Sequence, residues 1–232
     1  MTLRAKTEPS NHEEAIRKSL NAGKHVMVDY PVVPKFSIAK ELFALAAEKG
    51  LILHEENIGL LTMKLKKLKE EVQKKPPLKE GFLTSHSYFI GWLEKFEENG
   101  YPFTVQQGLI KYMMYLFGDL TPVGGQLITN EKGYVATGNV KTKDNKDITL
   151  TIHLTKEPLR WGKDYLLKFE DGSVIDKEPE VSQMTETGLG LFMEDLLHFA
   201  EKLTGKRDVH ELDAIALRTL EIAEGIQKNF SV

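Results

Sequence analysis

The 232-residue sequence contains no cysteine, no long apolar run and no excess of positive charge. Without cysteine, neither a disulfide nor a thiolate metal site is possible, which is typical of proteins from a reducing compartment. No apolar run is long enough to predict a membrane span. A net charge of −3 and a pI near 6.2 give no attraction for nucleic acid. Residues 1–6 have two basic side chains but no apolar core, so no secretory signal is predicted. We therefore expect a cytoplasmic protein that binds neither nucleic acid nor membrane.

The sequence also has no G-x-G-x-x-G loop, the turn on which Rossmann-type domains hold a dinucleotide. The nearest approach, Gly188-Leu189-Gly190, lacks the third glycine and does not follow a predicted strand. Residues 21–31 nevertheless resemble the second half of such a domain. A helix ends at Gly23, a short apolar strand follows, and a polar, aromatic and proline corner closes it. The sequence therefore predicts an oxidoreductase that lacks its phosphate-binding start.

Predicted helices and strands alternate in the first part of the chain. Ser10 and Glu13 form a capping-box pattern, and Gly23 and Gly50 suit the left-handed position after a helix. The predicted elements are a helix at 10–22, a strand at 25–28, a helix at 37–49 and a strand at 51–54. This alternation with short loops is typical of a parallel sheet.

Strands dominate the rest of the chain. Apolar residues alternate with threonine and histidine over 148–154, and turn residues at 144–147 and 171–172 indicate hairpins. Predicted helices lie at 57–75, ended by Pro76-Pro77, and at 104–117, 189–203 and 209–229. The lysines of 57–75 could indicate a nucleic-acid surface, but a solvated helix face is favoured, because Glu70 and Glu71 interrupt them and the overall charge is acidic.

We therefore predict an α/β protein in two parts. Residues 1–56 form a partial Rossmann-type parallel sheet. Residues 57–232 form an α+β domain with a mainly antiparallel sheet and helices on one face. Without further strands, the parallel sheet would expose an apolar edge that favours pairing with another chain. A monomer is expected, with that edge exposed.

Three segments carry a resemblance to a known family. Residues 21–31, His54-Glu55-Glu56 and residues 223–228 resemble the biliverdin reductases of the glucose-fructose oxidoreductase/inositol dehydrogenase group. The similarity extends over about residues 8–228. Asp29-Tyr30-Pro31 is the sharpest part: sugar-oxidising relatives carry Glu-Lys-Pro there and use the lysine in catalysis, whereas biliverdin reductases carry Glu-Tyr-Pro.

The resemblance implies an NADPH- or NADH-dependent reduction of biliverdin to bilirubin, a step of heme catabolism. Hydride goes to the central methine carbon and a proton to a pyrrole nitrogen. Tyr30 would lie beyond the carboxyl end of a strand, where it could contact the nicotinamide or the substrate. A phenol titrates near ~10 and is a reluctant acid at neutral pH, so a packing role stays open.

Further site residues also follow from the resemblance. The loop Pro9, Ser10, Asn11 and His12 would border the cofactor, with an ordinary helix cap as the alternative. Biliverdin reductases carry an arginine on the helix that faces the nicotinamide. Leu109 occupies that position, with Gln106, Gln107 and Lys111 nearby. Lys111 is the candidate catalytic cation in its place.

Other departures limit the resemblance. The early βα units have no counterpart, and residues 1–6 match nothing expected in the family. Mammalian members bind zinc through a histidine and cysteines. The corresponding positions here are Arg218, Thr219, Phe230 and Ser231. These residues form no credible ligand set, so no zinc is predicted.

Two classes of function stay open. The first is a biliverdin reductase, with a tetrapyrrole substrate. The second is a catalytically impaired form that binds a tetrapyrrole or a protein partner without turnover. A sugar dehydrogenase is disfavoured, because Tyr30 replaces the catalytic lysine and residues 104–117 contain no Asp-x-x-x-His pattern.

Overall fold

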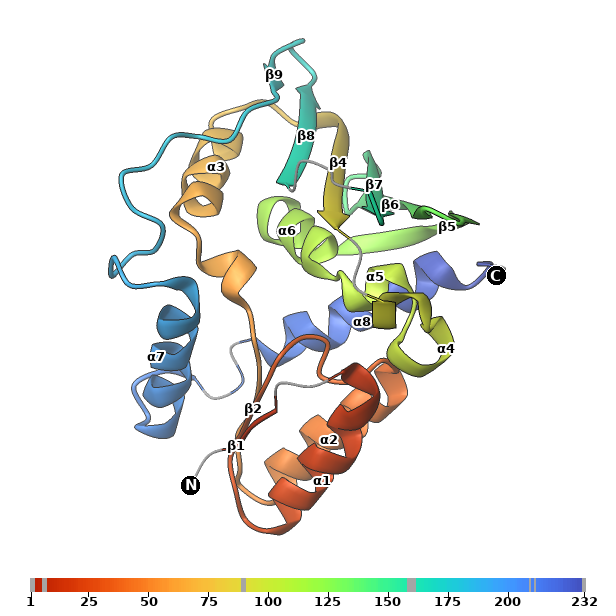
Figure 1. The fold of residues 1–232 in the computed structure, drawn as a ribbon. Helices are drawn as coiled ribbons and strands as arrows, with labels where there is room; N and C mark the ends of the chain where they lie inside the picture. Colours follow the sequence, from red (N-terminus) through yellow and green to blue (C-terminus); the bar gives the residue numbers. More distant parts are fainter. Residues whose placement is uncertain are drawn as a thin grey trace.

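The structure is a computed structural model that describes residues 3–5, 8–88, 91–157, 162–208, 210 and 212–230. The chain forms two β-sheets in turn, and its last helices return to the first sheet (Figure 1). This arrangement confirms the predicted α/β class, with one parallel sheet and one mainly antiparallel sheet.

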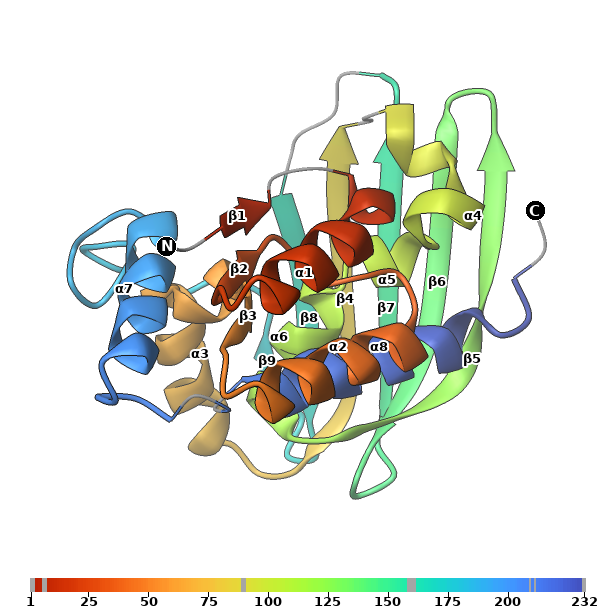
Figure 2. The ribbon, with the colours of Figure 1, turned by 90° about the horizontal axis from the view of Figure 1, so that it is seen from below.

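The first sheet is parallel. It consists of β1 (Leu3–Ala5), β2 (Val26–Val28) and β3 (Leu53–Glu55), in that order. The helices α1 (His12–Asn21) and α2 (Phe36–Glu48) pack on one face, and α7 (Leu191–Leu203) packs on the other (Figures 1 and 2). Side chains of a strand alternate between faces. Val26 and Val28 accordingly join the core under α1 and α2, whereas Met27 contacts Phe199 of α7.

The start of the chain corrects one prediction. A 3-10 turn, η1 (Pro9–Asn11), precedes α1, and no side chain caps that helix, so the Ser10–Glu13 capping box is wrong. The strand β1 pairs with β2, which is therefore central in the sheet. Gly23 and Gly50 do adopt the left-handed conformation, at φ 69° and 62°.

The second sheet has six strands in the order β5-β6-β7-β4-β8-β9, and each neighbouring pair is antiparallel except β4 and β7. Its strands are β4 (Leu78–Tyr88), β5 (Leu120–Asn130), β6 (Gly133–Thr142), β7 (Asp147–Thr155), β8 (Gly162–Phe169) and β9 (Val174–Ile175). The alternation over 148–154 is confirmed, because Ile148, Leu150 and Ile152 are buried while the threonines between them are partly exposed.

Helices cover one face of this sheet (Figure 2). They are η3 (Gly91–Glu94), α4 (Phe96–Asn99), α5 (Pro102–Val105), α6 (Gly108–Phe117) and α8 (Asp213–Gln227). The predicted helix at 104–117 is thus divided, with α6 beginning after Gln107. The helix α8 also packs Ala216 and Leu220 into the core of the parallel sheet.

The predicted helix at 57–75 is likewise divided. A 3-10 turn, η2 (Ile58–Leu61), precedes α3 (Met63–Gln73). Thr62 lies between them in an extended conformation, and its hydroxyl accepts from the Leu65 amide at 3.3 Å. This cap is a local signal that the apolar periodicity of the sequence conceals.

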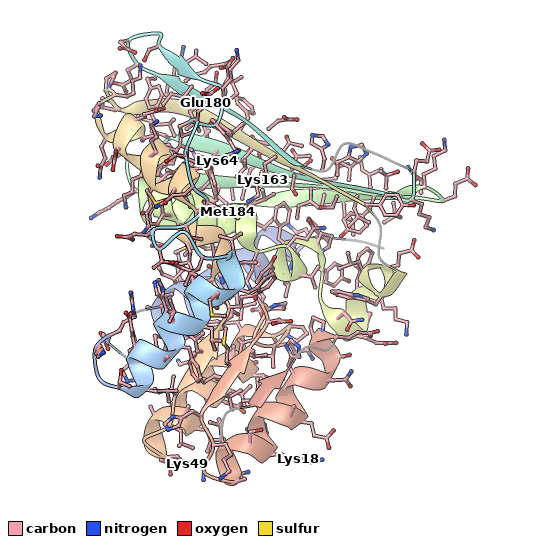
Figure 3. The ribbon with its side chains drawn as sticks, turned by 60° about the vertical axis from the view of Figure 1, so that its left-hand side comes forward. Lys18, Lys49, Lys64, Lys163, Glu180 and Met184 are labelled. Carbon is pink, nitrogen blue, oxygen red and sulfur yellow. The ribbon has the colours of Figure 1, made fainter. Side chains whose placement is uncertain are left out.

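The lysines of α3 bind a segment far along the chain. Lys64 donates to Glu178 at 2.7 Å, Lys67 to the Glu180 carbonyl at 2.9 Å, and Lys66 pairs with Glu186. Figure 3 shows Lys64 between Glu180 and Met184 of this segment. The predicted solvated face is confirmed, because Lys64 and Lys67 are exposed. Their surface contacts also connect α3 with residues 178–186.

Among the described residues, no helix is long and apolar enough to cross a membrane. The division at residues 56 and 57 stays a prediction. In the folded chain, α7 and α8 from beyond that division complete the layers around the parallel sheet.

Candidate active site at the edge of the parallel sheet

Polar side chains gather where the parallel strands end. Tyr30 follows β2, Glu55 ends β3 and Asn57 comes two residues later. Gln107 and Lys111 reach the same place from the start of α6. Ligands of open parallel sheets bind beyond the carboxyl ends of the strands. These five residues form the candidate site, called the sheet-edge cluster below.

Lys111 is a buried cation. Its side chain is 5% exposed, and its Nζ donates to Glu55 Oε1 at 2.6 Å and to Asn57 Oδ1 at 2.8 Å. A buried charge requires a paired and hydrogen-bonded partner, because removal from water costs several kcal/mol per ion. The ion pair therefore fastens α6 to the end of β3.

Glu55 joins three parts of the chain. Its second oxygen, Oε2, accepts from the Val32 amide at 2.7 Å and from Gln107 Nε2 at 3.3 Å. The corner after β2 and the first turn of α6 are thus held by the same carboxylate. Gln107 Oε1 is buried and has no hydrogen-bond partner among the described residues.

Tyr30 gives the cluster an accessible surface. Its side chain is 38% exposed, and the Lys111 ammonium lies 5.7 Å from its ring centroid, within the range of a cation–π contact. Partial burial raises the pKa of the Tyr30 phenol, and the carboxylates of Glu56, Asp29 and Glu55 raise it further. Tyr30 therefore keeps its proton at neutral pH and can donate a hydrogen bond to a ligand.

The predicted cofactor loop reaches this edge through one residue. His12 is buried, and its Nδ1 lies 2.9 Å from the Pro31 carbonyl, which can only accept, so this nitrogen carries the proton. Pro9 is buried, and the side chains of Ser10 and Asn11 are exposed. The Ser10 amide donates to Asn99 Oδ1 of α4 at 3.3 Å. The loop therefore contacts the Tyr30 corner through His12.

A cavity of about 430 Å³ lies beside the cluster. Lys111 lines it together with Leu60, Met114, Tyr115, Ile215 and Arg218, from η2, α6 and α8. The Arg218 guanidinium binds Asp119 at 2.7 Å and the Leu120 carbonyl at 2.8 Å. The cavity is thus largely apolar with its charges paired.

The sequence analysis gave no role to Glu55, Asn57 or Gln107. A weak signal for Glu55 was present, because an acidic residue directly after an apolar strand lies at the ligand-binding edge of a parallel sheet. Lys111 stands among Leu109, Ile110 and Met113 on an apolar helix, and an isolated cation there indicates a buried partner. Leu109 itself is 2% exposed in the core under the second sheet.

The described residues contain no candidate metal site. Within the described ranges, no group of three or more histidine, aspartate or glutamate side chains is placed to hold a metal ion. The absence of zinc stays a prediction.

Comparison with known proteins first defines the class. Residues 5–57 match a family described as oxidoreductases with an NAD-binding Rossmann fold. The crystal structure of biliverdin reductase from Synechocystis sp. PCC 6803, in complex with biliverdin and NADP+, superposes with a TM-score of 0.82 at 19% identity, covering 97% of this chain and 79% of that one. GenD2 of gentamicin A biosynthesis, in complex with NAD, gives 0.80 at 12% identity, with coverages of 98% and 75%. These likenesses establish the fold.

Sequence relatives narrow the class. Biliverdin reductase A of Homo sapiens is 34% identical over 226 residues, which are 96% of this chain and 73% of the human protein. The Mus musculus protein is 32% identical with the same coverage. The chain belongs to the biliverdin reductase A family of NAD(P)-dependent oxidoreductases. The predicted family and the nicotinamide class of cofactor are thereby confirmed.

Proposed function

We propose that this chain reduces biliverdin to bilirubin, with NADPH or NADH as the hydride donor and the central methine carbon as the acceptor. The observation that carries the proposal is the sheet-edge cluster. In it, the ring of the exposed and protonated Tyr30 lies 5.7 Å from the Lys111 ammonium, which is itself paired with the buried Glu55. The names of the human and mouse relatives and the biliverdin-bound Synechocystis structure support this substrate.

The residues at the sheet edge fit the nicotinamide end of the cofactor. The parallel strands present the neutral phenol ring of Tyr30 and the His12–Pro31 contact at their carboxyl ends, and neither repels a flat, uncharged ring. A bound nicotinamide would supply the hydride. Tyr30 would contact the nicotinamide or the tetrapyrrole, and Pro9, Ser10, Asn11 and His12 would border the cofactor.

The two candidate catalytic residues would position and stabilise the substrate, and the proton for the pyrrole nitrogen would come from solvent water at the exposed face of Tyr30. Tyr30 keeps its proton because its pKa is raised, so it would orient the substrate through a hydrogen bond rather than act as a strong acid. Lys111 would supply the positive charge near the reacting face, held in place by Glu55 and Asn57. The arrangement therefore favours catalysis by positioning and electrostatics over direct acid chemistry.

The test is to mix the purified chain with biliverdin and NADPH, then NADH, and to follow bilirubin formation by absorbance. Turnover supports the proposal. Biliverdin binding without turnover, by a folded protein, supports the alternative of a tetrapyrrole-binding form. Neither binding nor turnover by the folded chain contradicts both.

Tyr30→Phe connects this activity with the site. We expect a fall in kcat of about tenfold or more, because the phenolic hydrogen bond is lost while the ring remains. Tyr88→Phe is the matched control, since Tyr88 is 53% exposed on β4 of the other sheet. Equal activities of the two variants would remove Tyr30 from the mechanism.

A further inference from the structure

A buried carboxylate reaches the end of β3 from α7. Asp195 is fully buried, and its Oδ1 lies 3.2 Å from His54 Nε2 and accepts from the Asn57 amide at 3.4 Å. The Asp195 and Asn57 positions are 138 residues apart in the sequence. Among the described residues, Asp195 Oδ2 and His54 Nδ1 have no hydrogen-bond partner.

This placement runs against the usual pattern of a packed helix. On α7, Glu194, Asp195 and Lys202 are buried, whereas Met193 and Leu196 are exposed at 48% and 44%. A buried carboxylate with one unpartnered oxygen costs free energy that an apolar side chain of similar size would not. Packing alone therefore does not explain Asp195.

The contacts of Asp195 lead directly to the sheet-edge cluster. The side chain of Asn57 accepts from Lys111 at 2.8 Å and donates to the Glu55 carbonyl at 2.5 Å. His54 and Glu55 are neighbours on β3 and point to opposite faces, His54 to Asp195 and Glu55 to Lys111. Both α7 and α6 contact η2, which follows these residues. In Figure 1, α7 lies to the left of the segment that leaves β3.

We propose that Asp195 is a positioning residue for the reaction, which acts through Asn57 on Lys111. The inference rests on the proposed function. Asp195 fixes the Asn57 backbone from one side, so that Asn57 Oδ1 and Glu55 hold the Lys111 ammonium 5.7 Å from the Tyr30 ring. Without Asp195, the Asn57 amide loses this hydrogen bond and the Asn57 side chain is free to move. Of the two groups that bind the Lys111 ammonium, only Glu55 then stays fixed.

The kinetic test uses Asp195→Ala, Asp195→Asn and Asn57→Ala in the full chain, singly and combined. We expect kcat to fall about tenfold in Asp195→Ala with KM for biliverdin changed less than twofold, since an effect on positioning is felt mainly in the chemical step. In the Asn57→Ala background, Asp195→Ala should cost less than about twofold, because both changes break the same connection. Fully additive effects would overturn the proposal in favour of a structural role.

A second measurement needs neither cofactor nor turnover. The Cε resonance of Lys111, assigned by its loss in Lys111→Met, should move toward the values of exposed lysines in Asp195→Ala. It should stay near its wild-type position in Asp195→Asn, whose side-chain oxygen can still accept from the Asn57 amide. It should not move in Glu194→Gln, which alters the neighbouring buried carboxylate that binds Thr187. An unchanged Lys111 resonance would overturn the positioning role.

These two measurements distinguish a failure of the proposed function from a failure of the proposed role of Asp195. If the wild-type chain shows no turnover, the proposed function fails, and the Lys111 resonance alone decides whether Asp195 positions it. If Asp195→Ala does not fold by circular dichroism, Asp195→Leu replaces it, because leucine is similar in size and cannot accept from the Asn57 amide. The same shift of the Lys111 resonance is expected, and an unchanged resonance would contradict the proposal.

Discussion

A single buried ammonium connects three separate parts of this chain. Lys111 belongs to α6, its partners Glu55 and Asn57 belong to the end of β3, and Glu55 in turn holds the Val32 amide after β2. At the residue scale, the geometry of the candidate site therefore depends on the pairing of one lysine with one glutamate. The exposed Tyr30 ring lies 5.7 Å from the ammonium of this pair.

Lys111→Met should destabilise the fold. The Glu55 carboxylate would stay buried without its cation, and breaking a buried pair costs about 3–5 kcal/mol. Urea unfolding followed by circular dichroism measures the loss. The exposed pair of Lys18 with Glu14 provides the control, because Lys18→Ala should leave the unfolding midpoint unchanged. Equal midpoints for Lys111→Met and wild type would show that the pair contributes little.

Tyr30 should ionise above the usual range of a phenol. Its pKa is raised in the fold, so the unfolded chain loses this proton first as the pH rises above ~10. The contribution of Tyr30 to stability is therefore complete below that pH and is lost as the pH rises toward the folded pKa. The measurement is a pH titration of the ultraviolet absorbance of tyrosinate in wild type and in Tyr30→Phe. The difference between the two curves is the titration of the Tyr30 phenol. A titration step at or below the ordinary value would contradict the assigned environment.

At the scale of elements, close approach between helices and the second sheet is set by a glycine. A Cβ built on Gly138 of β6 would lie 2.8 Å from Ile226 of α8 and 2.9 Å from the Phe103 ring of α5. Both distances are shorter than real carbon contacts allow. The absence of a side chain at this position therefore lets α5 and α8 pack directly on β6.

Gly138→Ala should lower the free energy of unfolding by about 1–3 kcal/mol through overpacking. Gly108→Ala is the matched control: its Cβ would meet nothing within 4 Å in α6, so it should be neutral or slightly stabilising. Chemical denaturation of both variants provides the comparison. A Gly138→Ala variant as stable as Gly108→Ala would mean that α8 can move away at little cost.

At the scale of the whole molecule, α7 and the segment before it expose several apolar side chains. Met184, Leu189, Met193, Leu196 and Leu203 are each at least 40% exposed. Such side chains favour association when they meet a partner surface. The helix α7 lies beside β1, an edge strand of the parallel sheet in the described part of the chain (Figure 2).

Leu196→Lys should reduce any concentration-dependent self-association, because it places a charge among these exposed apolar side chains. Since Leu196 is 44% exposed, the unfolding midpoint should change little. Sedimentation velocity over a range of protein concentrations measures the effect. The control is Lys49→Ala, because Lys49 follows the end of α2, which packs on the opposite face of the parallel sheet from α7. An identical concentration dependence in wild type and both variants would show that Leu196 takes no part in association.

Local pattern by itself determined the alternation of helices and strands over residues 10–55, the glycine ends of α1 and α2, and the family, whose resemblance is sharpest at the contiguous Asp29-Tyr30-Pro31 corner. These features depend on neighbours along the chain, so periodicity and turn chemistry reveal them. The tertiary structure alone decided the partners of Lys111, which are 54 and 56 positions away, the burial of Asp195 inside α7, and the attachment of the α3 lysines to residues 178–186. A charged side chain can face water or a buried partner with the same sequence pattern. Which of the two it meets depends on how distant elements pack, and no local window contains that information.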